Sequence, residues 1–154
     1  MSLGGMRKGR RLGVDVGDVR VGVACCDPDG LIATPVETVA AGPGCIGRLA
    51  ELASEYDVIE VVVGLPLSLS GRDGPAATKV RAFTAELAEA VRPTAVRLVD
   101  ERMSTMTADI QLRESNRSGR NKRAVIDQVA ATVILQAALD AERIRGNAPG
   151  ERVQ

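Results

Sequence analysis

Short runs of apolar residues alternate along this chain with longer segments in which apolar residues recur every three or four positions. Such runs, when bounded by turn residues, predict β-strands that are buried in a sheet. Pro35 lies within one of them, and because proline cannot donate a hydrogen bond to a central ladder, we expect that strand at the edge of the sheet. The predicted strands cover residues 11–16, 20–26, 32–39, 58–63 and 95–100.

The segments with helical spacing predict four α-helices between and after these strands. Pro75 suits the first turn of one helix, Ser104 is a good N-cap for another, and Gly146 ends the last. The order of elements, β-β-β-α-β-α-β-α-α, predicts an α/β fold in which α-helices flank a mixed five-stranded sheet with three antiparallel and two parallel strands. The predicted helices cover residues 45–56, 75–91, about 104–115 and about 123–145.

The length of 154 residues predicts one domain with one sizeable core. We expect this domain to span residues 10–146, between an N-terminal tail at 1–9 and a frayed C-terminal tail at 147–154. The longest apolar runs are far shorter than a membrane span, and no signal peptide is recognisable. We therefore expect a cytoplasmic protein that does not bind a membrane.

The most informative stretch contains the first predicted strand, in which apolar residues lead up to a single carboxylate, Asp15. Gly17 then lets the chain turn and a second apolar strand returns, which predicts a β-hairpin with Asp15 near the end of a buried strand. A carboxylate there is costly unless it is paired, hydrogen-bonded or bound to a metal. Taken alone, Asp15 fits a turn residue, a phosphate-loop residue or a metal ligand.

Three further carboxylates lie at the ends of predicted elements. Asp100 and Glu101 follow the fifth strand, and Asp127 lies in the first turn of the predicted final helix. If the first and fifth strands are parallel, their carboxyl ends share one edge of the sheet, where sites in open α/β sheets gather. Clustered carboxylates suit Mg²⁺ or Mn²⁺, and two such ions can activate water and stabilise the leaving oxygen of a phosphodiester.

Simpler explanations of the same carboxylates stay open. Asp127 could merely favour the dipole of its helix, and Asp100 and Glu101 could form surface ion pairs with Arg102 or Arg20. The chain has no histidine, which excludes His-based triads and most zinc sites. Its three cysteines form neither a disulfide framework nor a zinc pattern, and we expect the adjacent pair at 25 and 26 to be small core residues.

Two polar segments near this edge predict contacts with nucleic-acid phosphates. The loop 64–74 carries hydroxyls and an arginine, which suit a flap over a substrate, although an ordinary connecting loop is the simpler interpretation. A basic segment precedes Asp127; beside metal ligands it would clamp a phosphate backbone, and alone it would be a solvated loop. The candidate nucleic-acid-binding residues are Arg20, which is either a phosphate contact or an ion-pair partner, Ser70, Arg72, Arg117, Arg120, Lys122 and Arg123.

The overall charge adds little, because 20 Lys and Arg balance 20 Asp and Glu. Aromatic residues are nearly absent, with one tyrosine and one phenylalanine, which argues against a surface that stacks nucleic-acid bases.

Four ordered motifs resemble the YqgF/RuvX family of Holliday-junction resolvase-like proteins over about residues 10–140. They are Gly13-x-Asp15-x-Gly17-x-x-Arg20-x-Gly22-x-Ala24, Val63-Gly64-Leu65-Pro66 with Ser70-Gly71, Asp100-Glu101-Arg102-x-Ser104-Thr105, and Asp127-x-x-Ala130-Ala131 with Ile134-Leu135. The resemblance implies a ribonuclease H-like fold and a metal-dependent nuclease site. It assigns Asp15, Glu101 and Asp127 as catalytic metal-binding carboxylates, with Asp100 as a further ligand.

The favoured hypothesis is a nuclease that uses two Mg²⁺ or Mn²⁺ ions on structured nucleic acid. The resemblance implies maturation of the 5′ end of the small-subunit (16S) ribosomal RNA precursor, with Holliday junction resolution in DNA recombination as the alternative. A non-catalytic nucleic-acid-binding module on the same fold also stays open. An ATP-binding phosphotransferase ranks lower, because the chain is long enough for only one of the two domains that such enzymes need. The partner is thus an rRNA precursor or branched DNA, and the protein is a monomer or a homodimer.

Overall fold

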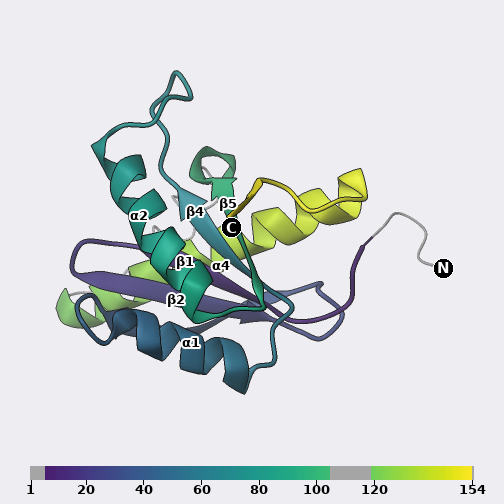
Figure 1. The fold of residues 1–154 in the computed structure, drawn as a ribbon, viewed down its shortest axis with the longest axis horizontal. Helices are drawn as coiled ribbons and strands as arrows, with labels where there is room; N and C mark the ends of the chain where they lie inside the picture. The colour runs from purple at the N-terminus through teal and green to yellow at the C-terminus, as the bar shows by residue number, and fades with distance from the viewer. Residues whose placement is uncertain (1–5, 105–118, 154) are drawn as a thin grey trace.

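The computed structural model describes residues 6–104 and 119–153 (Figure 1). An open sheet forms its centre, with strands in the order β3-β2-β1-β4-β5-β6. β1 pairs antiparallel with β2 and parallel with β4, and β4 pairs parallel with β5. The strands are β1 Arg11–Val16, β2 Arg20–Cys26, β3 Ala33–Ala40, β4 Glu60–Leu65, β5 Ala95–Asp100 and β6 Glu151–Val153.

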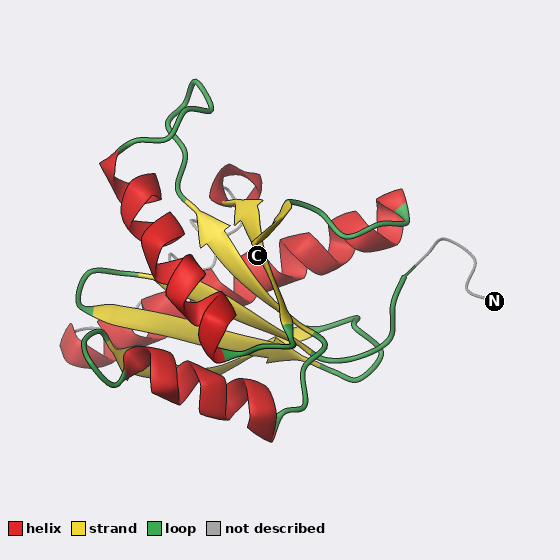
Figure 2. Cartoon of the chain, viewed as in Figure 1, coloured by secondary structure: helices red, strands yellow, loops and turns green. Residues whose placement is uncertain are grey.

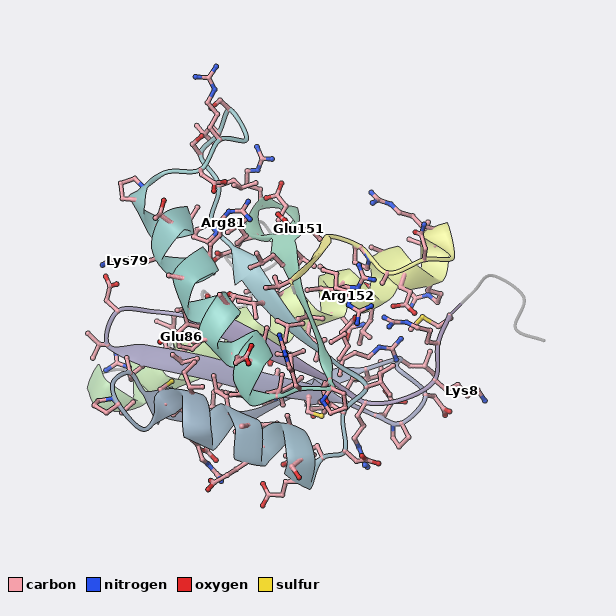
Figure 3. All side chains as sticks on the ribbon, viewed as in Figure 1. Lys8, Lys79, Arg81, Glu86, Glu151 and Arg152 are labelled. Atoms are coloured by element: carbon pink, nitrogen blue, oxygen red, sulfur yellow. The ribbon has the colours of Figure 1, made fainter. Side chains whose placement is uncertain are left out.

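The predicted α/β architecture is confirmed, but the sheet has six strands rather than five. The sixth strand, β6, pairs antiparallel with β5 in the segment that we expected to be frayed. Gly150, with φ +82°, lets the chain turn onto the open edge of β5. Val153 then packs against the core, and Arg81 donates to the Glu151 carboxylate at 3.0 Å (Figure 3). Pairing with β5 and these contacts hold the C-terminal segment in place. Its Pro- and Gly-rich composition had predicted a frayed end.

Helices cover both faces of the sheet (Figures 1 and 2). On one face, Leu12 and Val14 of β1 belong to a core that includes buried leucines of α1 Cys45–Glu55 and α2 Pro75–Ala90. On the other face lies α4 Gly119–Arg145, which buries Ile134 and Leu135 in a second core. The short helix η1 Glu101–Ser104 continues directly from β5. The helix that we predicted over about 104–115 lies outside the described residues.

The face under α4 is lined with small residues, so that the helix lies directly on the strands. A Cβ atom added at Gly13 would lie 2.7 Å from the Cβ of Leu135, and one added at Gly64 would lie 2.7 Å from the Cδ1 of Ile134. At Gly22 it would overlap the backbone carbonyl oxygen of Asp127. Since protein interiors are close-packed, these glycines fix how near α4 approaches the sheet.

A network of buried charges closes the end of the sheet where β1 and β4 begin. Arg11, Glu60 and Glu142 are each at most 2% exposed. Arg7 bridges the two glutamates at 2.9 and 2.7 Å, Arg11 donates to Glu142 at 2.9 Å, and Arg97 donates to Glu60 at 2.8 Å. Arg7 therefore docks on the core, although it belongs to the segment that we expected to be an N-terminal tail.

The adjacent cysteines 25 and 26 are buried on β2, as expected. Within the described part of the chain, no helix has the length and apolar character needed to cross a membrane.

Candidate active site

Asp15 lies near the carboxyl end of β1, on the face of the sheet that α4 covers. It is placed there by strand alternation, because Gly13, two residues earlier, contacts α4. Its partner across the β1–β2 ladder is Gly22. The side chain is half-buried, between the closed core and the solvent at the strand ends. The predicted hairpin is thus confirmed, and Asp15 occupies an accessible position on a rigid strand.

Glu101 reaches the same edge from β5. It is the first residue of η1, immediately after the strand ends, and it is half-buried. β4 lies between β1 and β5, and Gly64 near its end carries no side chain to separate the two acids. The parallel pairing of β1, β4 and β5 explains why their carboxyl ends bring Asp15 and Glu101 to one place.

Asp127 completes the cluster from α4. The contact between Gly22 and the Asp127 carbonyl fixes this point of the helix against β2, opposite Asp15. The predicted position of Asp127 in the first helical turn is wrong, because α4 begins at Gly119. The influence of the helix dipole is confined to the first turn, so it does not explain an aspartate in the third.

The electrostatics of the cluster show that its carboxylates interact. Burial, together with the negative charges of Glu101 and Asp127, raises the pKa of Asp15 to about 7. Burial also raises the pKa of Glu101, as does the neighbouring charge of Asp100. Like charges held together at a half-buried site favour a bound proton or a bound cation.

Arg20 is the cation that faces Asp127. Its Nε donates to Oδ2 of Asp127 at 2.9 Å, and both side chains are partly exposed. Of the two roles predicted for Arg20, the structure shows the ion pair.

Asp100 lies beside the cluster but is engaged elsewhere. Its carboxylate accepts hydrogen bonds from the backbone N–H and the guanidinium of Arg102, the shortest at 2.6 Å. Hydrogen bonds from Arg102 hold the pKa of Asp100 below its usual range. The same guanidinium donates to the carbonyls of Ser68 and Leu69 at 3.3 and 3.2 Å. Sequence reasoning treated Arg102 only as a partner for surface acids and missed that it ties the flap to β5.

The flap itself projects beyond the sheet between β4 and α2 (Figure 1). An isolated bridge between Leu67 and Asp73 closes its base. Ser70 and Arg72 are exposed on it, and the Ser70 hydroxyl lies 2.9 Å from that of Ser68. Leu69 is 97% exposed. The flap therefore presents the predicted Ser70 and Arg72 to solvent.

An open cleft of about 340 Å³ leads to the acids between the β1–β2 turn and the start of α2. Lys79 lines it and pairs with Asp18 at 3.2 Å. The walls also include Asp15, Glu101, Pro66 and Pro75. The cleft is large enough to admit part of a nucleic-acid backbone.

The basic segment could not be placed against this site. Arg117 lies outside the described residues, and the side chains of Arg120, Lys122 and Arg123 in the first turns of α4 are not described. Their predicted phosphate contacts stay predictions.

The donor set suits a hard divalent cation, because three carboxylates converge without soft ligands. Within residues 6–104 and 119–153, however, no three His, Cys, Asp or Glu side chains lie close enough together to enclose a metal ion. The carboxylate of Asp127 is instead paired with Arg20 at 2.9 Å. The chemistry of the three side chains fits Mg²⁺ or Mn²⁺.

The sequence profile of the family described as "RuvX: Holliday junction resolvase" matches residues 9–141. The chain belongs to the RuvX family. Its relatives in the family include a protein of Streptomyces avermitilis, 59% identical over 152 residues that cover 97% of each chain, and one of Streptomyces coelicolor, 60% identical over 151 residues that cover 97% of this chain and 90% of the relative. Each is named "Putative pre-16S rRNA nuclease".

Solved structures show the same fold for this RuvX chain. The RuvC structure of Thermus thermophilus superimposes with a TM-score of 0.60 at 16% identity, covering 92% of this chain and 99% of that one. RuvC of T. thermophilus in complex with a Holliday junction gives a TM-score of 0.57 at 17% identity, with the same coverage. This likeness confirms the ribonuclease H-like fold.

Proposed function

We propose that this RuvX protein is a divalent-metal-dependent nuclease that matures the 5′ end of the 16S rRNA precursor. The observation that carries the proposal is the convergence of Asp15, Glu101 and Asp127 from three separate elements, with Asp15 and Glu101 lining one open cleft. The names of relatives 59% and 60% identical over nearly the whole chain support the substrate. A nuclease with this substrate would act in the cytoplasm, and we assign the activity to the single domain spanning residues 10–146.

Asp15, Glu101 and Asp127 would hold the metal, with Asp15 facing both partners from the central strand. When bound, Mg²⁺ or Mn²⁺ would supply an activated water and stabilise the leaving oxygen of the phosphodiester. Asp15 retains its proton to about pH 7 in the metal-free protein, so it must release that proton before it can serve as a ligand. Asp100 orients Arg102 instead, and we do not include Asp100 among the residues that would hold the metal.

The nucleic acid would lie across the cleft and under the flap. Ser70 and Arg72 are exposed there and can donate to phosphate oxygens, and Arg20 lies at the rim beside Asp127. Arg117, Arg120, Lys122 and Arg123 would extend the phosphate contacts next to α4. Because such contacts do not read bases, specificity for a precursor end must come from its shape.

A cleavage assay tests this function directly. A transcript carrying the 5′ end of the 16S precursor and a four-way DNA junction are incubated with the protein and Mn²⁺, beside an Asp15→Asn variant and a chelator control. We expect the wild type to cut the transcript, and both controls to be inactive. If the Asp15→Asn protein cuts as fast as the wild type, or if the wild type only binds without cutting, the proposal is wrong.

Holliday junction resolution is the second candidate, and the description of the matching family favours it. The same assay decides between them. Cleavage of the four-way junction at paired positions, with the transcript left intact, would establish the resolvase and reject the rRNA substrate.

A further inference from the structure

In the ion pair between Arg20 and Asp127, the guanidinium is an internal cation that a metal ion could displace. Asp127 cannot move as a whole, because its backbone carbonyl lies against Gly22 of β2. Only rotation of its side chain changes what the carboxylate reaches. Arg20, two residues before Gly22 on the same strand, engages Oδ2 at 2.9 Å. β2 therefore carries the ion-pair partner of this carboxylate, Arg20, and also holds the backbone of Asp127 in place through Gly22.

Arg20 compensates only one of the three acids. Among the described residues, its guanidinium forms an ion pair with Asp127 and with no second carboxylate. The arginine thus engages Asp127 and neither Asp15 nor Glu101. A divalent cation that binds all three acids would compete with the guanidinium for the carboxylate of Asp127.

Once released, the guanidinium of Arg20 would remain at the rim of the site. It is already partly exposed, and its planar donors match the oxygens of a phosphate group. A phosphate that attracts Arg20 would in turn free Asp127 for the metal. Binding of the two ligands would then be mutually favourable, since coupling free energies are reciprocal.

We propose that Arg20 competes with the metal ion for the carboxylate of Asp127. Arg20 holds this carboxylate until a divalent cation binds Asp127 and a nucleic-acid phosphate binds Arg20. This inference rests on the proposed metal-dependent function and names how that site is regulated. It predicts that the metal-free protein is held in an open arrangement of its acids and closes that arrangement only as it is loaded.

Mn²⁺ affinity without nucleic acid tests the competition. Free Mn²⁺ is measured by electron paramagnetic resonance in the presence of the wild type, Arg20→Gln, Arg20→Lys or Arg48→Gln. Arg48→Gln is the control, because Arg48 is similarly exposed and forms an ion pair of 2.7 Å with Glu37, which is not one of the three acids. We expect Arg20→Gln to bind Mn²⁺ about fivefold more tightly or better, Arg20→Lys to lie between it and the wild type, and Arg48→Gln to match the wild type. Equal or weaker binding by Arg20→Gln would overturn the proposal.

A second readout separates displacement from a general effect of charge. The Nε–H resonance of Arg20, identified by its loss in Arg20→Lys, is followed while Mg²⁺ is added to the wild type. We expect this proton to be protected from exchange with water in chelator and to lose that protection as Mg²⁺ binds. A resonance that stays protected when the protein is saturated with Mg²⁺ would overturn the displacement even if the affinities differ.

The outcomes also separate this inference from the function on which it rests. If neither wild type nor Arg20→Gln binds Mn²⁺ while both remain folded by thermal melting, the proposed metal-dependent nuclease itself is wrong. If both bind Mn²⁺ with the same affinity, the metal site stands and only the role of Arg20 is rejected.

Discussion

The two ends of β1 carry buried charge in opposite ways. At its start, Arg11 lies in a closed network in which three arginines meet two glutamates at 2.7–2.9 Å. At its other end, Asp15 lies among carboxylates, and its pKa is raised by burial and by the charges of Glu101 and Asp127. The first end joins opposite charges within the protein, whereas the second gathers like charges around Asp15.

This difference separates the end of the sheet where paired charges contribute to stability from the end where we propose the functional site. A buried charge loses hydration, and nearby opposite charges must offset that loss. The network does so with internal partners that are far apart in the sequence. At the acidic end, the charges of Glu101 and Asp127 act on Asp15, and a site that keeps like charges together is one that gains by taking up a cation.

The strongest way to break the comparison is to remove a partner from the network. Glu142→Ala leaves Arg11 and Arg7 without their shared carboxylate, and we expect it to lower the free energy of unfolding by about 3–5 kcal/mol in urea titrations. The matched control is Glu89→Gln, which breaks an exposed pair with Arg92 and should cost less than about 1 kcal/mol. Equal effects of the two variants would show that the network is not what stabilises this end.

At the acidic end the same kind of substitution should stabilise the protein. The folded-state pKa of Asp15 is raised to about 7, above its unfolded value of about 3.9, so folding becomes less favourable as the pH rises through that interval. Asp15→Asn removes this cost, and in chelator at pH 8 we expect it to raise the free energy of unfolding by about 2 kcal/mol. Near pH 4 the difference should vanish. A destabilised Asp15→Asn protein at pH 8 would contradict the account.

The two ends should also respond to acid in opposite directions. Burial alone would raise the pKa of Glu142, but hydrogen bonds from Arg7 and the charge of Arg11 lower it below its usual range. A lowered folded-state pKa means that this stabilisation is present above the unfolded pKa and is lost as the pH falls. Urea titrations between pH 2 and 6 on Asp15→Asn, which lacks the opposing group, should therefore show stability falling below about pH 4.5.

A smaller effect is expected where Arg102 joins the acidic end to the flap. Arg102→Ala removes the hydrogen bonds to the carbonyls of Ser68 and Leu69 and frees Asp100. We expect KM for the nucleic acid to rise severalfold, with little change in the melting temperature, because the flap is no longer tied to the end of β5. Arg92→Ala, an exposed arginine away from the cleft, is the control, and an unchanged KM for Arg102→Ala would show that the flap does not contact substrate.

The smallest effect concerns the surface pair in the cleft. Lys79 and Asp18 are both largely exposed, so Lys79→Gln should change the free energy of unfolding by less than about 0.5 kcal/mol. If a phosphate enters this cleft, the same variant should reduce the slope of log affinity against log salt by about one in anisotropy titrations. An unchanged slope would place the nucleic acid elsewhere on the molecule.

The hairpin, the parallel strands and the acids at their ends were predictable, because apolar runs and turn residues are local signals. The position of Asp127 was not, since the start of α4 is a boundary that periodicity defines poorly. The third turn, rather than the first, faces Gly22, and only the packed structure shows that contact. Composition also misled us at β6, whose stability comes from pairing with β5.

The buried ion-pair network could not be predicted from the sequence for a different reason. Arg7 and Glu142 are 135 positions apart, and neither belongs to a motif. Glu60 and Arg97 sit in strands whose apolar neighbours dominate the pattern. Long-range ion pairs leave no periodic signal, so the charged residues within predicted strands were the one available hint.

The central claim is that Asp15, Glu101 and Asp127 form one cation site at the open end of β1. It is tested most directly by Mn²⁺ binding to Asp15→Asn, Glu101→Gln and Asp127→Asn, with Glu89→Gln as a control that keeps every site carboxylate. We predict that each site variant loses at least about tenfold in Mn²⁺ affinity while melting as a folded protein, and that the control binds as the wild type does. Wild-type affinity in any two of the three site variants would contradict the claim.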